Sequence, residues 1–144
     1  MKLRTGDPWM KAADYGRTLR GLTLNLLVSQ VEPALLFHRQ VLGAELVYAD
    51  PDFAVLRGYG AEWMLHADHT YLGHPVGRTT GGSARRGAGL ELRLHGRDPD
   101  ETEAAARRLR FEVLLASADT GHGVREVFPL ERDGYVWAPD IALP

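Results

Sequence analysis

The densest group of side chains that could bind a metal ion or move a proton lies near the middle of the chain. It consists of three histidines and an aspartate within one short stretch: His66, Asp68, His69 and His74. A metal site needs at least three ligands held at about 2.1 Å, and an irregular loop does not specify that geometry. The alternative, polar residues at a strand end that runs into a solvated loop, explains the same pattern. His66 is the strongest candidate, because alternation places it on one strand face with Glu62 and Met64.

A second candidate group is charged and lies on one face of a later strand. Glu91, Arg93 and His95 alternate with three leucines, so they point to the same side. A buried charge without a partner is costly, and a ligand can supply one. The alternative is a solvated face on which Glu91 and Arg93 form a neighbour pair of little energetic consequence.

Thr23 and Asn25 form a third, smaller group on an earlier strand. They alternate with Leu22, Leu24 and Leu26 and therefore share a face. Both side chains can hydrogen-bond a ligand. Ordinary polar residues on a partly solvated strand are the alternative.

The elements that carry these residues occur twice in the same order. Strand 22–28 leads into a helix through Ser29-Gln30-Val31-Glu32, and strand 90–94 leads into another through Asp98-Pro99-Asp100-Glu101. In each, a capping oxygen is followed three residues later by a glutamate, which is the capping-box pattern. Three shorter strands follow each helix, at 45–49, 53–57 and 62–66 and at 111–116, 124–129 and 135–138. The sequence predicts two β-α-β-β-β modules packed side by side with a groove between them.

Several buried positions follow from the same periodicities. The first helix carries a stripe that includes His38 among apolar residues, so we expect His38 in the core. Gly43 stands where that helix should end. Trp137 alternates with Ala138 and is expected to pack against a helix. Asp133-Gly134 predicts a hairpin turn between the last two strands.

The chain divides into an extension and one α+β domain. Residues 1–20 are weakly patterned, with a possible short helix around 10–15, and residues 21–144 form the domain: module 1 at about 21–66, a loop at 67–88 and module 2 at about 89–140. The loop is long, Gly-rich and basic, which is typical of a linker or a lid over a site.

Composition excludes several classes of function. With 144 residues, of which 44% are apolar and 25% charged, the chain has the size of one globular domain. A net charge of −2 gives no footprint for nucleic acid or an anionic membrane surface. No apolar run approaches the roughly 20 residues that span a bilayer. The absence of cysteine excludes thiolate chemistry and suits the cytoplasm.

The repeated order and three phrases resemble the vicinal oxygen chelate superfamily, which includes glyoxalase I, bleomycin-type resistance proteins, fosfomycin-modifying enzymes and extradiol dioxygenases. The phrases are residues 26–32 leading to Phe37-His38-Arg39-Gln40-Val41-Leu42-Gly43, then Arg125-Glu126-Val127-Phe128 and Asp133-Gly134-Tyr135-Val136-Trp137. The resemblance covers about residues 21–139. It implies sheets that curl into a cup, often in a homodimer.

The resemblance also places possible metal ligands. Metal-using members carry one ligand early in the first strand and one on the last strand of each module, which here fall on Thr23, Glu91, the Glu62/Met64/His66 face and Ala138. Only Glu91, with Glu62 or His66, could bind a divalent metal. Threonine and alanine remove half of the usual ligand set.

The function we expect is binding or sequestration of a small organic molecule in the cup without a complete metal site, as in the bleomycin-resistance branch. The expected ligand-binding residues are Thr23, Asn25, Glu62, Met64, His66, Glu91, Arg93 and His95. One alternative is a metal-dependent lyase, isomerase or dioxygenase that uses Glu91 and His66, with His69 drawn in by the loop. Another is a cofactor-free acid–base enzyme with Glu91 or His95 as the base.

Overall fold

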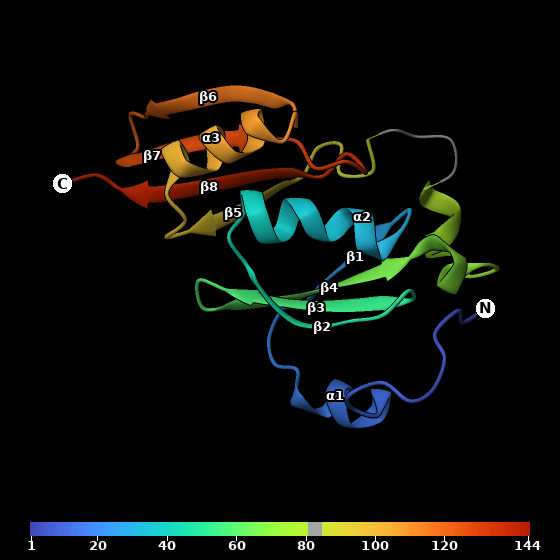
Figure 1. Cartoon of the computed structure of the whole chain (residues 1–144). Coiled ribbons are helices and arrows are strands. Elements are labelled where there is room, and N and C mark those ends of the chain that lie inside the picture. Colours follow the sequence, from blue (N-terminus) through green and yellow to red (C-terminus); the bar gives the residue numbers. More distant parts are fainter. Residues whose placement is uncertain (81–84) are drawn as a thin grey trace.

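The computed structural model describes residues 1–80 and 85–144 and contains two four-stranded sheets with helices packed on them (Figure 1). The first sheet has the order β1-β4-β3-β2 and the second has the order β5-β8-β7-β6. The strands are β1 (Leu24–Val28), β2 (Glu45–Ala49), β3 (Phe53–Gly58), β4 (Ala61–Ala67), β5 (Glu91–His95), β6 (Val113–Asp119), β7 (Val124–Pro129) and β8 (Val136–Ala142). In each sheet the first strand runs parallel to the last, and the other pairs are antiparallel. The predicted α+β fold of two β-α-β-β-β modules is confirmed; below, module 1 is residues 24–67 and module 2 is residues 91–142.

Each module carries its helix on one face of its sheet. In module 1, α2 (Val31–Leu36) continues as a π-helical turn, η1 (Phe37–Val41), and in module 2 the helix is α3 (Pro99–Arg108). Gly43 ends the first helix with φ +68°, and a Cβ there would lie 2.8 Å from the Tyr59 hydroxyl, so the position requires glycine. The remaining helices are α1 (Ala12–Thr18) and two 3₁₀ turns, η2 (Asp68–Tyr71) and η3 (Val76–Thr80). None of the helices described is long and apolar enough to cross a membrane.

One hydrophobic core joins the two modules. Trp63 of β4 and Trp137 of β8 lie with their ring centroids 5.3 Å apart, and Phe37 contacts Phe111 edge to face at 5.1 Å. The predicted burial of His38 and Trp137 is confirmed. Nδ1 of His38 accepts a hydrogen bond of 3.1 Å from Nε1 of Trp63, and burial lowers the pKa of His38 to about 3. The imidazole is therefore a neutral core group at physiological pH.

The boundaries of several elements differ from prediction. Ser29 does not cap the first helix, because the N-cap is Gln30 and its side chain makes no capping bond. The backbone N–H of Ser29 instead donates to Asp133 of module 2. At the second helix the prediction is confirmed: the carboxylate of Asp98 accepts from the N–H of Glu101 at 3.0 Å. The loop predicted at 67–88 contains η2 and η3, and its residues 81–84 lie outside the described part of the chain.

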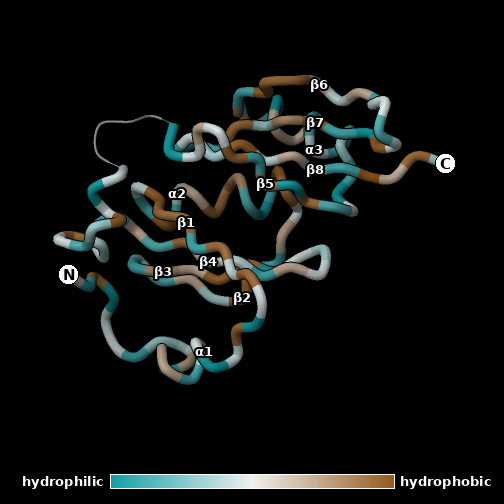
Figure 2. The backbone as a smooth tube through the Cα atoms, turned by 180° about the vertical axis from the view of Figure 1, so that it is seen from behind, coloured by the Kyte–Doolittle hydropathy of each residue, from teal (hydrophilic) through white to brown (hydrophobic). Residues whose placement is uncertain are grey.

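The last strand is longer than expected. It begins at Val136 and runs through Pro139 to Ala142, whereas the sequence predicts an end at Ala138. Proline interrupts strands because it cannot donate to the ladder. Here the pairing of β8 with β7 reaches Asp140 and is broken beside Pro139, while β5 pairs along the other edge. β6, the edge strand of this sheet, is apolar over much of its length (Figure 2).

Candidate functional site

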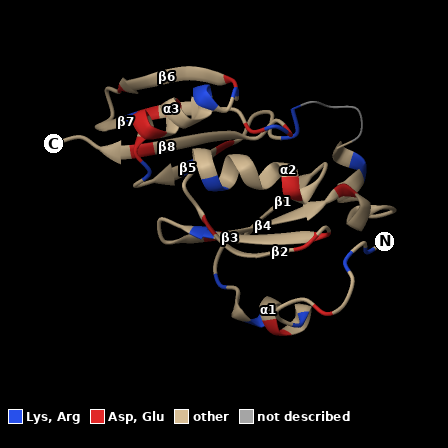
Figure 3. Ribbon diagram, in the orientation of Figure 1, with Lys and Arg blue, Asp and Glu red and all other residues tan. Residues whose placement is uncertain are grey.

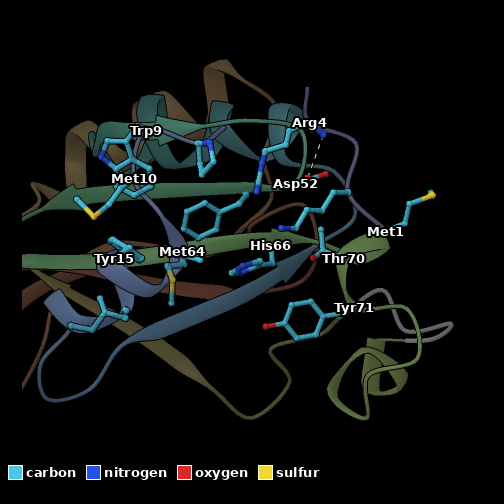
Figure 4. Close-up of a pocket in the computed structure, with 16 residues that line it drawn as sticks. Met1, Arg4, Trp9, Met10, Tyr15, Asp52, Met64, His66, Thr70 and Tyr71 are labelled. Atoms are coloured by element: carbon cyan, nitrogen blue, oxygen red, sulfur yellow. Dashed lines mark hydrogen bonds between the residues drawn. The ribbon is translucent and has the colours of Figure 1, made fainter. Parts of the chain in front are cut away.

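The first candidate site lies between residues 1–20, the N-terminal segment, and the face of the module 1 sheet opposite α2 (Figure 4). It is a cavity of about 490 Å³, within the range of about 300–1,000 Å³ typical of small-molecule sites. We call it the aromatic cavity. Its walls come from the N-terminal segment, the β3–β4 hairpin and η2: Met1, Lys2, Arg4, Pro8, Trp9, Met10, Ala12, Tyr15, Gly16, Leu19, Asp52, Phe53, Met64, His66, Thr70 and Tyr71.

Strand alternation supplies the floor of the aromatic cavity. Trp63 and Leu65 of β4 point into the core, so Met64 and His66 point to the opposite face. Asn25 pairs with Met64 across the parallel β1–β4 ladder and shares that face. Antiparallel pairing brings Phe53 opposite His66, and their rings lie 4.7 Å apart.

Aromatic contacts and a hydrogen bond of Tyr15 hold the middle of the N-terminal segment over this floor. Trp9 stacks on Tyr48 at 4.7 Å with an interplanar angle of 21°, and lies 6.3 Å from Phe53 at 24°. The hydroxyl of Tyr15 donates to Glu62 at 2.9 Å. The segment therefore forms a wall of the cavity.

A buried carboxylate anchors the start of the N-terminal segment. Asp52 is 2% exposed and accepts hydrogen bonds from the N–H groups of Leu3 and Arg4 and from Nε2 of His69 at 2.7 Å. Burial raises the pKa of Asp52, but the hydrogen bonds from His69 and the backbone outweigh it and hold the pKa below its usual value. The oxygens of Asp52 are thus committed to the fold.

Three side chains form a hydrogen-bonded chain beside the cavity. His66 Nδ1 lies 2.6 Å from the amide oxygen of Asn25, and the amide nitrogen of Asn25 donates to the Tyr71 hydroxyl at 2.7 Å. Burial lowers the pKa of His66, which favours the neutral ring. A neutral ring that donates through Nδ1 keeps Nε2 as an acceptor, and a phenol that accepts from Asn25 keeps its own proton to donate. The chain therefore offers a ligand one acceptor and one donor.

Charged residues lie on the strands of module 2 (Figure 3), and four of them, together with His95, are bonded to one another on the corresponding face. Arg93 of β5 donates to Glu126 in a very short contact, to Asp140 at 3.1 Å and to Glu91 at 3.2 Å. Nδ1 of His95 lies 2.8 Å from the other oxygen of Asp140, which is only 2% exposed. We call these five residues the Arg93 cluster. Its three carboxylates are paired with Arg93, a cation of the protein itself.

A second opening, the seam groove, lies between the two modules. It has a volume of about 660 Å³ and is bounded by residues at the β1–β4 edge and the β5–β8 edge. Thr23, Glu62, Glu91 and Arg93 are among its lining residues. It corresponds to the groove that the sequence predicts between the halves.

Solved structures with this arrangement share a common fold. A glyoxalase/bleomycin resistance protein/dioxygenase family enzyme from Burkholderia phytofirmans PsJN is 15% identical, with a TM-score of 0.69 over 84% of this chain and 97% of that chain. A glyoxalase-related enzyme from Fulvimarina pelagi is 13% identical, with a TM-score of 0.66 over 85% and 87%. Lactoylglutathione lyase from Agrobacterium tumefaciens is 16% identical, with a TM-score of 0.60 over 85% and 92%. The chain has the glyoxalase/bleomycin resistance protein/dioxygenase fold. No protein-family model and no curated protein sequence matches it.

Within this glyoxalase fold, the predicted site residues are divided among three places. Met64 and His66 line the aromatic cavity and Asn25 is bonded beside them. Thr23, Glu62, Glu91 and Arg93 line the seam groove, and Glu91, Arg93 and His95 belong to the Arg93 cluster. The sequence predicts that these residues line one site, whereas the structure distributes them over these three places.

The described residues do not fit the divalent metal site that the resemblance implies. Glu91 and His66 line different openings, and Glu91 is already paired with Arg93. Within residues 1–80 and 85–144, no three His, Cys, Asp or Glu side chains lie close enough to hold one ion. A metal at the Arg93 cluster would have to displace a guanidinium from its carboxylates.

Sequence reasoning missed the residues that complete both regions. Trp9 and Tyr15 help to build the cavity, and the available signal was the presence of aromatic residues in an otherwise weakly patterned extension. Asp140 and Glu126 complete the Arg93 cluster. Asp140 was missed because the predicted last strand ended before Pro139, and Glu126 because nothing local to its strand indicates Arg93 as its partner.

Proposed function

We propose that this protein binds a small organic molecule in the aromatic cavity and that it does so without a metal. The observation that carries this proposal is a preformed, mostly apolar cavity built by two segments far apart in the sequence, residues 1–19 and 52–71. Apolar cavities with a few converging polar groups are the usual form of small-molecule sites. Here the polar groups are Asn25, His66 and Tyr71.

The arrangement favours binding over metal-assisted chemistry. A metal-dependent lyase or dioxygenase needs ligands that converge on one ion. In the described chain three carboxylates of module 2 converge on Arg93. His66 makes a hydrogen bond with Asn25. The residues near the cavity can position and shield a ligand. The homodimer expected from the resemblance stays a prediction.

A matched pair of substitutions on α1 tests the location of the site. Ala12 and Ala13 are neighbouring exposed residues, but only Ala12 lines the aromatic cavity. We expect Ala12→Phe to fill part of the cavity and weaken ligand binding about tenfold or more, and Ala13→Phe to leave it unchanged. The probes are three naphthalenes of different charge: 2-naphthoate, 2-naphthalenemethanol and 2-naphthylmethylamine. Thermal shift detects binding and isothermal titration measures affinity.

Either of two outcomes contradicts the proposal. One is that none of the three probes stabilises the protein at millimolar concentration. The other is that Ala12→Phe and Ala13→Phe bind the best probe with equal affinity, which would place binding elsewhere, for example in the seam groove.

A further inference from the structure

The aromatic cavity has two chemically different ends. Figure 4 shows Trp9, Met10 and Tyr15 at one end and Arg4, Thr70 and Tyr71 at the other. The first end is aromatic and thioether surface, which packs well on flat, polarizable groups. The second end carries the charged and hydrogen-bonding groups. A ligand that matches both ends has a flat apolar body and a polar terminus.

Two of the rings favour a planar ligand body. Trp9 and Phe53, which form one wall of the cavity, lie 24° from parallel, while Tyr48 backs Trp9 at 21° and Tyr15 is tilted by 57° against it. Aromatic side chains gain from offset stacking or edge contact with another ring. An aromatic or conjugated skeleton uses this wall better than a branched aliphatic one.

Aromatic walls also bind organic cations. The charges in the cavity lining therefore decide whether the polar end of the ligand is cationic or anionic. Aromatic cages recognise ammonium groups through cation–π attraction. The side-chain charges in the lining of this cavity, however, are the cations Lys2 and Arg4 and one carboxylate, Asp52. Asp52 already accepts three hydrogen bonds from the protein. A cationic ligand would meet two like charges and no free carboxylate in this lining.

The two cations are available to an anion. Arg4 makes a single loose ion pair, 4.0 Å from Asp50, although a guanidinium has five N–H donors. No ion pair joins Lys2 to any residue in the described part of the chain. The Tyr71 hydroxyl, which keeps its proton to donate, adds a neutral donor at the same end. These groups suit a carboxylate or another acidic oxygen group.

We propose that the ligand of the aromatic cavity is a planar aromatic acid, with its ring system against Trp9 and Phe53 and its anionic group at Lys2 and Arg4. This inference rests on the proposed binding function and specifies its substrate class. It predicts selectivity by charge among ligands of one shape.

The same three naphthalene probes test the inference, because they share a skeleton and differ in charge. We expect 2-naphthoate to bind about tenfold more tightly than 2-naphthalenemethanol, which is the effect of one charge-assisted contact. 2-Naphthylmethylamine should bind most weakly. The preference for the acid should shrink as salt is raised from low to near-molar ionic strength.

A pair of double variants locates the charge effect. Lys2→Gln with Arg4→Gln should remove most of the preference for 2-naphthoate and leave the affinity for 2-naphthalenemethanol unchanged. Lys11→Gln with Arg17→Gln removes the same charge from the same segment, outside the cavity lining, and should keep the preference. Melting temperatures of both double variants check that the segment remains folded.

The outcomes separate this inference from the proposed function. If the three probes bind equally well and Ala12→Phe weakens them all, the binding function stands and the acid assignment is overturned. Tighter binding of the amine, or an equal loss of preference in the two double variants, also overturns it. If no probe binds, both proposals fail.

Discussion

The two modules share one backbone plan and use the same sheet face in opposite ways. In module 1 the face opposite the helix carries Phe53, Met64 and His66, and the N-terminal segment covers it. In module 2 the equivalent face carries Arg93 and Asp140, whose charges are paired with each other and with their neighbours. The strand order and the parallel pairing are the same in both.

The comparison teaches that topology determines which residues share a face and that their chemistry determines its use. On module 1, apolar and neutral side chains line a cavity and do not fill it. Charged groups on module 2 satisfy each other, because an unpaired charge at a position such as Asp140, which is 2% exposed, would be costly. One module therefore offers a cavity, and the other offers a self-contained ion-pair cluster.

The largest expected effect comes from removing the cation of the Arg93 cluster. Arg93→Ala leaves Glu126 and Asp140 near each other without their common partner, and their side chains are 11% and 3% exposed. Removing one partner of a buried ion pair costs about 3–5 kcal/mol, and we expect about 3 kcal/mol here because Arg93 itself is partly exposed. Urea denaturation at pH 7 measures the loss.

The matched control lies in module 1. Arg57 pairs with Glu62 at 3.0 Å on a more exposed surface, so Arg57→Ala should cost less than about 1 kcal/mol. Arg93→Lys keeps the charge but loses the planar fork and should recover part of the stability. Equal losses in Arg93→Ala and Arg57→Ala would show that the two modules do not differ in this respect.

The two modules also differ in the turn before the last strand. This difference predicts an effect of pH on stability. Glu131, in the β7–β8 turn, is 1% exposed, and one of its oxygens accepts from the N–H of Asp133 at 2.8 Å. Burial, and then the charge of Asp133, raise the pKa of Glu131 to about 7. The β3–β4 turn of module 1 has Tyr59-Gly60 at the corresponding place.

The sign of the pH effect follows from this raised pKa. Between its ordinary value of 4.5 and about 7, Glu131 is protonated in the folded protein and ionised in the unfolded chain. The folded state then binds more protons at Glu131, so this group lowers the free energy of unfolding as pH rises, by about 2 kcal/mol between pH 5.5 and 8. His38, whose pKa is lowered to about 3, acts in the opposite direction over the lower part of this range. Glu131→Gln should remove the Glu131 contribution and keep that of His38.

Denaturation of three proteins across that pH range checks the expectation. The wild type and the exposed-carboxylate control Glu45→Gln in module 1 should follow the same pH dependence, while Glu131→Gln should gain about 2 kcal/mol of stability relative to both between pH 5.5 and 8. The prediction is wrong if Glu131→Gln and the wild type show the same pH dependence.

Local periodicity was sufficient to predict the duplicated fold and the two strand faces. Period-two alternation correctly placed Met64 with His66, and Glu91 with Arg93 and His95, because one buried face of a strand specifies the other. The helical stripe likewise predicted the burial of His38. These inferences need only neighbours in sequence.

The partners of those faces could not be predicted, because they come from distant segments. Asp52 fixes Leu3 and Arg4 across more than forty residues, and Arg93 meets Asp140 in a strand that continues past a proline. Ser29 was predicted to cap the first helix, but the N-cap is Gln30, and the Ser29 N–H donates to Asp133 in the other module. In each case tertiary packing overrides a local signal.

The smallest expected effect tests what keeps the cover on module 1, the feature that module 2 lacks. Tyr15 is 7% exposed, and its hydroxyl donates to Glu62, so Tyr15→Phe removes one hydrogen bond while keeping the ring. We expect a loss of about 1 kcal/mol, confined to the N-terminal segment, with faster amide exchange over residues 1–20 and unchanged exchange in β3 and β4. Tyr59→Phe removes a similar bond, to the carbonyl of Leu42, and should leave the segment protected. Unchanged exchange in Tyr15→Phe would mean that ring packing around Trp9, with the bonds from Leu3 and Arg4 to Asp52, is sufficient to hold the cover.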